Sequence, residues 1–338
     1  MKYKKKQFIA CLLILFVATT AYGQTKKVVR QVSKPVAQKV TPKKAPASKS
    51  DTGVLMVDRK PETGIPLDDS YRTGQKEMRV ASPVWRGQVF KGQPKDHFKL
   101  RQNSCTELRG DMEEKLLADF KKVYDFKSYR IPKGKAVSSK VNNVDVSRFP
   151  STYNGRILHS FNFYDNCTIA YYVNTSRKYQ STDYIMVVDK KNQMYILNFS
   201  AFSKAPYTNP GDEDFVIQDV SNAHLVGDIL YVHHGHDTYA YSSGGKNAYI
   251  SAIDLKYNKV LWTSAPLTCN SNFIIVGNTI ICGYGFSAEP DYVYLVDMAT
   301  GQRRQTLKVA SGPSNIVKKG NQIHVLTYGE YYVFDIVN

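Results

Sequence analysis

The sequence lacks the short motifs that identify common enzyme classes. It contains no Gly-x-Ser-x-Gly turn, no glycine loop of the kind that cradles phosphate and no His-Glu-x-x-His helix, so neither serine hydrolases, P-loop proteins nor zincins have a signature here. A pair of carboxylates for glycoside hydrolysis is not marked by any local pattern. We therefore predict no catalytic residue and no cofactor, and we favour a binding role over catalysis.

Acidic residues are absent from the first 50 positions, which hold 12 Lys or Arg. These residues supply 12 of the formal net charge of +17, which leaves +5 for residues 51–338. A nucleic-acid-binding domain gathers basic residues on one face of its fold, so we expect no nucleic-acid partner. Residues 24–50 are rich in Lys, Pro, Ala, Val and Ser, a composition that buries too little apolar surface to fold. We interpret residues 24–81 as a linker, either a solvated spacer or a segment that adheres to an anionic surface.

Long apolar runs are also missing. The apolar run at residues 8–17 follows four lysines and precedes the small-residue site Ala21-Tyr22-Gly23, which is the pattern of a secretory signal peptide. A membrane span needs roughly 20 apolar residues, so we interpret residues 1–23 as a cleaved signal, with a retained anchor as the alternative. We predict an exported protein, periplasmic or extracellular, that is not an integral membrane protein.

Cysteine is scarce, and four remain beyond the signal: Cys105, Cys167, Cys269 and Cys282. An oxidising compartment permits disulfides, and four cysteines allow three connectivities. Cys269 and Cys282 flank one predicted hairpin, but a tight turn at its tip would set Phe273 opposite Cys282. Their pairing stays open, with buried free thiols as the alternative.

Repetition is the main feature that the sequence does have. Beyond Tyr153, short runs of Val, Ile, Tyr and Phe are broken by Gly, Asn and Asp, which is the composition of strands and turns. Four pairs of turn residues, each followed by an apolar strand, predict four hairpins: Asn154-Gly155, Gly227-Asp228, Gly277-Asn278 and Gly320-Asn321. A third strand that ends in Asp follows each hairpin, at residues 184–189, 249–254, 292–297 and 332–335, and a fourth strand follows in three cases. A four-stranded unit with a spacing of 43 residues between Asp254 and Asp297 is typical of a β-propeller.

The units resemble the blades of pyrroloquinoline-quinone-type and WD-repeat-like β-propellers. In those blades the third strand and its turn read aliphatic-Tyr-x-aliphatic-Asp-x-x-Thr-Gly-x-x-x-Trp; here Thr300-Gly301 keeps the turn and Trp262 keeps the aromatic residue. The resemblance covers roughly the last 185 residues. It implies an all-β fold, namely a β-propeller of four-stranded meander blades. Four units are recognisable, and the number of blades is four, or five or more. Its motifs are structural and imply no activity.

One helix is predicted before the repeats. Ser104 and Glu107 fit a capping box, and apolar residues at helical spacing extend the prediction over residues 104–126. The last unit stops after its third strand, and a ring propeller would take the missing outer strand from an earlier part of the chain. Residues 83–90 are the candidate, because closure would remove an exposed sheet edge. The predicted propeller-like domain therefore spans residues 82–338.

The long links between second and third strands should all emerge on one face of such a fold. We expect these links at residues 164–183, 233–247, 283–291 and, briefly, 328–330. They concentrate aromatic residues, which we take as candidate ligand-binding residues: Tyr171, Tyr172, Tyr239, Tyr241, Tyr284, Phe286 and Tyr328. Loops held by a rigid scaffold are where binding residues concentrate, and tyrosine gives contact area at a low cost in entropy. We expect this face to bind a glycan, a peptide or a protein partner. The alternative is that these side chains pack over the blade edges.

A histidine cluster is a second candidate site. His233, His234, His236 and Asp237 offer the ligand types of a zinc site, although their spacing matches no hydrolase pattern. An exposed loop with chance histidines and a ligand-contacting loop are the alternatives. An envelope hydrolase or lyase that uses His and carboxylate groups on the long-link face is the alternative function.

Overall fold

The computed structural model describes residues 55–57, 77–92, 98–175, 181–202, 205 and 208–338. The chain divides into two units, Met1–Lys49 and Ser50–Asn338, and the described residues belong to the second. The predicted signal peptide, the basic segment and most of the linker lie outside the described residues. Within the described part, no helix has the length and apolar character of a membrane span.

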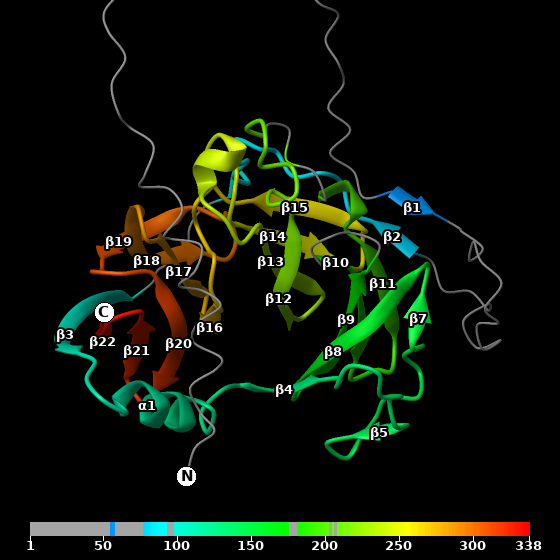
Figure 1. Ribbon diagram of the computed structural model, residues 1–338, viewed down its shortest axis with the longest axis horizontal. Coiled ribbons are helices and arrows are strands. Elements are labelled where there is room, and N and C mark those ends of the chain that lie inside the picture. The colour runs from blue at the N-terminus through cyan, green and yellow to red at the C-terminus, as the bar shows by residue number, and fades with distance from the viewer. Residues whose placement is uncertain (1–54, 58–76, 93–97, 176–180, 203–204, 206–207) are drawn as a thin grey trace, which may run out of the picture. The chain divides into compact units, whose positions relative to one another are not determined.

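The second unit consists mostly of antiparallel β-sheets (Figure 1). The first sheet follows the order β1-β2-β11-β10-β9-β8-β4, with β7 paired to β8. Its strands are β1 (Leu55–Val57), β2 (Glu77–Arg79), β4 (Phe126–Arg130), β7 (Thr152–Tyr153), β8 (Arg156–Tyr164), β9 (Cys167–Asn174), β10 (Ser181–Asp189) and β11 (Met194–Asn198). A separate hairpin joins β5 (Lys140–Val141) and β6 (Val144–Asp145).

Three further sheets have four strands each. The second sheet contains β12 (Asp219–Val226), β13 (Ile229–Gly235), β14 (Tyr249–Asp254) and β15 (Lys259–Thr263). The third contains β16 (Ile274–Val276), β17 (Thr279–Phe286), β18 (Glu289–Asp297) and β19 (Arg303–Lys308). The fourth contains β20 (Pro313–Lys319), β21 (Gln322–Thr327), β22 (Glu330–Val337) and β3 (Lys99–Glu107). Two short 3-10 helices, η2 (Ser200–Phe202) and η3 (Ala240–Ser243), lie in the connections.

All four predicted hairpins are confirmed by strand pairing: β7 with β8, β12 with β13, β16 with β17 and β20 with β21. Their turns need residues that tolerate a left-handed backbone, and Gly277, for example, has φ of 57° with open space around it. Local turn chemistry therefore determines where each hairpin reverses.

The sheets pack face to face in the order of the sequence. One apolar cluster joins the first sheet to the second and includes Ile169 and Leu230. A second cluster joins the second sheet to the third around Trp262, and another joins the third to the fourth around Phe334. Full burial of one such side chain contributes about 1.5–3 kcal/mol. These shared clusters make the second and third sheets apolar on both faces.

The strand that completes the fourth sheet comes from early in the chain. β3 pairs with β22, so that Lys99 lies opposite Val337 and Glu107 opposite Glu330 (cyan beside red in Figure 1). The prediction that an earlier segment supplies the missing outer strand is confirmed, but residues 83–90 are the wrong segment. They form a single bridge between Gln88 and Thr263 of β15 instead.

The predicted helix over residues 104–126 is also wrong in its bounds. The observed helix, α1 (Met112–Phe120), is shorter, and Ser104 and Glu107 belong to β3. Backbone pairing with β22 outweighs the local capping box, because it pairs eight residues of β3 with the neighbouring strand. α1 packs on the fourth sheet through Phe120, which contacts Val317 and Leu326.

Two strands lie inside the region that we predicted to be linker. β1 pairs with β2, and β2 pairs in parallel with β11 of the first sheet. The predicted boundary at residue 81 therefore comes too late for the sheet. The four cysteines beyond the predicted signal are free thiols: Cys105 is exposed, and the other three are buried.

Candidate functional site

The links between second and third strands lie at one end of the second, third and fourth sheets, which we call the link end. The link of the second sheet is long, residues 236–248, whereas those of the third and fourth sheets are residues 287–288 and 328–329. The predicted long links at residues 164–183 and 283–291 are therefore wrong, since the first contains β9 and the second is mostly strand.

In the second, third and fourth sheets the antiparallel order places the link between second and third strands at one end and the tight turns at the other. In the first sheet the Asn154-Gly155 turn lies at the same end as the start of β10, because Ile157 and Thr182 both pair with Val173 of β9. Contacts between sheets join the link ends: the Thr182 N–H donates to Asp219, and the Ala240 N–H donates to Glu289 Oε1 at 2.7 Å. The Ser311 hydroxyl donates to Glu330 Oε2 at 2.8 Å.

Three of the seven predicted aromatic residues are exposed at the link end. The exposed fractions are 40% for Tyr239, 78% for Tyr241 and 88% for Tyr328. Phe286 is half-buried, and its ring lies 4.7 Å from the Tyr239 ring in an edge-to-face arrangement. Tyr239, Tyr241 and Tyr328 lie in connections of the second and fourth sheets, and Phe286 is the last residue of β17 in the third sheet.

The other three predicted aromatic residues are buried in sheets. Tyr171 and Tyr172 are neighbours on β9 and pack into two different clusters, because both faces of the first sheet are covered. The Tyr172 hydroxyl donates to the Pro150 carbonyl at 2.9 Å. Tyr284 packs between the second and third sheets, and its hydroxyl donates to Glu289. These three side chains therefore belong to the core of the sheets and not to an exposed surface.

One exposed aromatic residue was missed by the sequence analysis. Phe215, which is 46% exposed, lies in the connection between β11 and β12. That connection reaches η3, since the Asn209 N–H donates to the Ser242 carbonyl at 2.9 Å. We define the link-end surface by Phe215, Tyr239, Tyr241, Phe286 and Tyr328.

The structure places the histidine cluster on β13 and just beyond it, with all three imidazoles buried. Each ring bonds a different serine hydroxyl: His233 Nδ1 to Ser221 Oγ at 2.6 Å, His234 Nε2 to Ser251 Oγ at 2.9 Å, and His236 Nε2 to Ser243 Oγ at 2.8 Å. Neighbouring residues of a strand point to opposite faces, so His233 and His234 diverge. Asp237 is exposed. The described residues contain no group of three or more His, Cys, Asp or Glu that could hold a metal ion.

Burial keeps these imidazoles neutral. It lowers the pKa of His233 and of His236 to about 4, and that of His234 well below the usual value. A charge on His233 would lower the pKa of its neighbour His234 further. The cluster therefore supplies neutral hydrogen-bonding groups to the core at pH 7.

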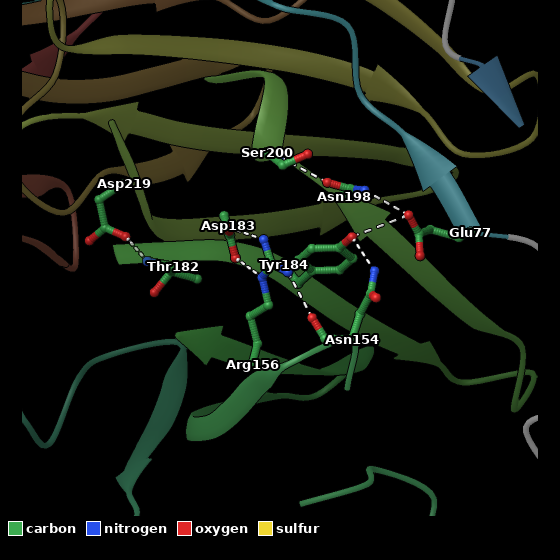
Figure 2. Close-up of polar contacts among 9 residues, drawn as sticks. All are labelled: Glu77, Asn154, Arg156, Thr182, Asp183, Tyr184, Asn198, Ser200 and Asp219. Atoms are coloured by element: carbon green, nitrogen blue, oxygen red, sulfur yellow. Dashed lines mark hydrogen bonds and ion pairs between the residues drawn. The ribbon is translucent and has the colours of Figure 1, made fainter. Parts of the chain in front are cut away.

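A buried polar network lies in the first sheet (Figure 2). The Glu77 carboxylate of β2 accepts hydrogen bonds from Asn198 Nδ2 at 2.6 Å and from the Tyr153 hydroxyl at 3.1 Å. The Tyr184 hydroxyl lies 3.4 Å away and accepts from Asn154 Nδ2 at 2.7 Å. Burial, together with the charge of Glu77, raises the pKa of both tyrosines, that of Tyr184 to about 12. Both phenols therefore stay protonated and can donate to Glu77.

An ion pair extends this network toward the link end (Figure 2). Arg156 Nε and Nη2 donate to Asp183 Oδ1 and Oδ2 at 2.9 and 2.7 Å, which is a two-point contact. The Arg156 guanidinium also lies 4.8 Å from the centre of the Tyr184 ring. Asp183 is buried and follows Thr182, whose N–H donates to Asp219 at the start of β12 in the second sheet. The network positions the start of β10, where the first and second sheets meet.

Replacement of Asp183 by Ala should destabilise the fold by about 3 kcal/mol, because a partly buried guanidinium loses both of its acceptors. Urea unfolding followed by circular dichroism measures this change. The double variant Asp183→Leu with Arg156→Met removes both charges and should recover most of the loss. A loss below about 1 kcal/mol in the single variant would contradict the positioning role of the pair.

Comparisons with known proteins add little to this description. No family model matches the chain, and no curated protein sequence matches it. Among solved structures, the computationally designed Ika4 protein is 14% identical over 52% of this chain and 88% of its own, with a TM-score of 0.32. BamB from Moraxella catarrhalis is 10% identical over 54% of this chain and 82% of its own, with a TM-score of 0.25. The AfRom2 CNH domain is 11% identical over 84% of this chain and 93% of its own, with a TM-score of 0.27.

Proposed function

We propose that this chain is an exported, non-catalytic binding or scaffold protein with a β-propeller fold, and that its link-end surface recognises a glycan, peptide or protein partner of the cell envelope. Three features support the propeller. The four sheets pack in sequence order, and β3 supplies the last outer strand from the other end of the domain. A further contact joins the fourth sheet to the first. The Tyr124 ring stacks on Phe126 of β4, and the Tyr124 hydroxyl donates to Asn315 Oδ1 of β20 at 2.5 Å.

The exposed aromatic side chains at the link end carry the functional part of the proposal. Side chains of this size that stay in water on a well-packed scaffold mark an interaction surface, and tyrosine provides both ring area and a hydroxyl. Four residues of the link-end surface are at least 40% exposed. The tight-turn end of the second sheet offers a matched reference in Tyr257, which is 70% exposed in the turn after β14.

The hydrolase or lyase alternative has less support. The histidines that would serve it are buried, neutral and directed to separate serines. A general base must reach the proton that it removes. Among these histidines and Asp237, only the aspartate is exposed at the link end.

The proposal is tested by binding of the immobilised full chain to arrays of envelope glycans and peptides. The variant Tyr241→Ala with Tyr328→Ala should bind the captured ligand at least about tenfold more weakly, as expected for exposed aromatic anchors. Tyr257→Ala, which removes an equally exposed ring at the tight-turn end, should bind as the unmodified chain does. Equal binding by all three proteins, or release of a reaction product from any array component, would overturn the proposal.

A further inference from the structure

Carboxylates surround the link-end surface. The connections at this end are residues 208–218, 236–248, 287–288, 309–312 and 328–329, and the charged side chains named below lie in them or within three residues of them. In their described residues, the basic side chains are Lys246 and Lys308. The acidic side chains are Asp212, Glu213, Asp214, Asp219, Asp237, Glu289, Asp291 and Glu330. Carboxylates therefore outnumber basic side chains in these connections, and Arg109, which follows Leu108 beside Gly329, is paired with Glu107.

One group of these carboxylates lies between the third and fourth sheets. Burial, followed by the charges of Glu330 and Glu289, raises the pKa of Asp291. Asp291 Oδ1 is buried without a hydrogen-bond partner. Among the described residues, none of these three carboxylates forms an ion pair with Lys or Arg. Within the described part of the chain, no cation therefore balances their negative charge.

A second group, Asp219 and Asp237, lies where the first and second sheets meet, since Asp219 accepts a hydrogen bond from the Thr182 N–H. Burial raises the pKa of Asp219 to about 6, and the charge of Asp237 contributes to the shift. Beside Asp219, the Gln218 amide is buried, and neither its nitrogen nor its oxygen has a partner. A buried amide without partners costs about 1–3 kcal/mol. This end of β12 thus keeps both a donor and an acceptor that the described chain does not use.

We propose that the ligand of the link-end surface is an extended peptide segment that carries lysine or arginine side chains. This inference rests on the proposed function, because it concerns the same surface. Uncompensated carboxylates attract ammonium and guanidinium groups, and exposed tyrosine rings bind the same groups through their faces. An extended peptide backbone can carry several such groups, so that they reach both groups of carboxylates, whereas the buried polar atoms of Gln218 lie beneath the surface and do not contact the ligand.

The charge separates this ligand from the other envelope components. Anionic polymers and phosphate headgroups would be repelled by the carboxylates. A neutral glycan could stack on the tyrosines, but it would leave the carboxylates without a role. A cationic peptide uses both kinds of side chain.

The test is a fluorescence anisotropy titration of the full chain with a labelled 12-residue peptide of alternating lysine and serine. A second peptide, with glutamine in place of lysine, is the matched probe. We expect the lysine peptide to bind at least about tenfold more tightly than the glutamine peptide at 50 mM salt, and to weaken several-fold at 300 mM salt as screening grows. Asp237→Asn with Asp291→Asn should weaken the lysine peptide about fivefold or more.

Asp228→Asn is the control, since Asp228 lies in the tight turn before β13 and Asp237 follows the other end of the same strand. It should leave the affinity unchanged. Equal affinity for the two peptides, no binding of the lysine peptide, or equal weakening by Asp228→Asn would overturn the inference. If Tyr241→Ala with Tyr328→Ala still abolishes capture of a neutral glycan, the proposed function stands and the cationic ligand is rejected. If these aromatic substitutions change neither kind of binding, the proposed function falls as well.

Discussion

Lowering the pH from 7.5 to 5 is expected to remove several kcal/mol of unfolding free energy, because four buried imidazoles resist protonation. Burial lowers the pKa of His224, His233 and His236 to about 4 and that of His234 further. In the unfolded chain a histidine takes up its proton near pH 6.5. Between pH 6.5 and 4 the unfolded chain therefore binds more protons, and stability falls as the pH falls. Above about pH 7 this effect vanishes.

Carboxylates whose pKa is raised by burial act in the opposite direction, and they are Asp219, Asp125, Asp237 and Asp291. Burial raises the pKa of Asp219 to about 6, so between about pH 6 and 4 its folded form binds the extra proton and gains stability on acidification. Each histidine contributes a loss of about 1–2 kcal/mol at pH 5, and Asp219 contributes a gain of about 1 kcal/mol. The four imidazoles are almost completely buried, whereas Asp125, Asp237 and Asp291 are less buried than Asp219, so the histidines dominate and the net effect of acid is destabilising.

The urea midpoint at pH 7.5, 6 and 5 measures this dependence. His224→Gln removes one imidazole that packs among Tyr164, Phe126 and Phe273, and it should flatten the pH dependence by about a quarter. Asp125 Oδ2 lies 3.6 Å from His224 Nδ1, but burial also raises the pKa of Asp125, so both groups favour their neutral forms. His159→Gln, at a half-buried position on β8, should change the slope less. Equal midpoints at pH 7.5 and pH 5 would contradict the neutral-histidine interpretation.

The repeats could be predicted because their signals are local. A turn such as Gly277-Asn278 needs a left-handed backbone at one position, and the apolar residues on either side specify the two strands. The third strand of each unit follows the same rule, since it pairs with the strand before it. Such pairings join neighbours in the sequence, and a pattern of residues is sufficient to detect them.

The closing strand could not be predicted, because its partner is far away in the sequence. Asn103 bonds Asp335 across 232 positions, and nothing around residue 103 encodes that distance. Ser104 and Glu107 fit a helix start by their local pattern, but the open edge of β22 offers many more hydrogen bonds. Long-range pairing outweighed local preference at this strand.

The candidate site was predictable as a region and not as a set of residues. Tyr171, Tyr172 and Tyr284 have the same composition signal as Tyr241 and Tyr328, but the first three lie in strands whose faces are covered. The cover over Tyr172 includes Val141, Val146 and Phe149, a segment without strand periodicity in the sequence. Burial of a tyrosine depends on such distant segments. The Glu77 network had no signal, because its partners lie 76 to 121 positions away.

Trp262→Ala is expected to lower the free energy of unfolding by about 4 kcal/mol, because this side chain fills the interface between the second and third sheets. Trp262 is buried, its ring lies 5.9 Å from that of Tyr231, and its Nε1–H donates to the Met298 carbonyl at 3.0 Å. Trp262→Phe keeps an aromatic ring but loses the donor, so it should cost about half as much. Tyr257→Ala, at an exposed ring in the turn before the same strand, should change stability by less than about 0.5 kcal/mol.

The neighbour of Trp262 explains why the repeat pairs this aromatic residue with a Thr-Gly turn. Gly301 belongs to the next unit and has φ of 71°, and a Cβ atom there would lie 2.5 Å from Trp262 Cε3. Gly301→Ala should therefore destabilise the fold through both backbone strain and a clash. In the Trp262→Ala background only the strain remains, so the two substitutions should couple by about 1 kcal/mol or more. Strict additivity in urea unfolding would show that the tryptophan does not require glycine at the next turn.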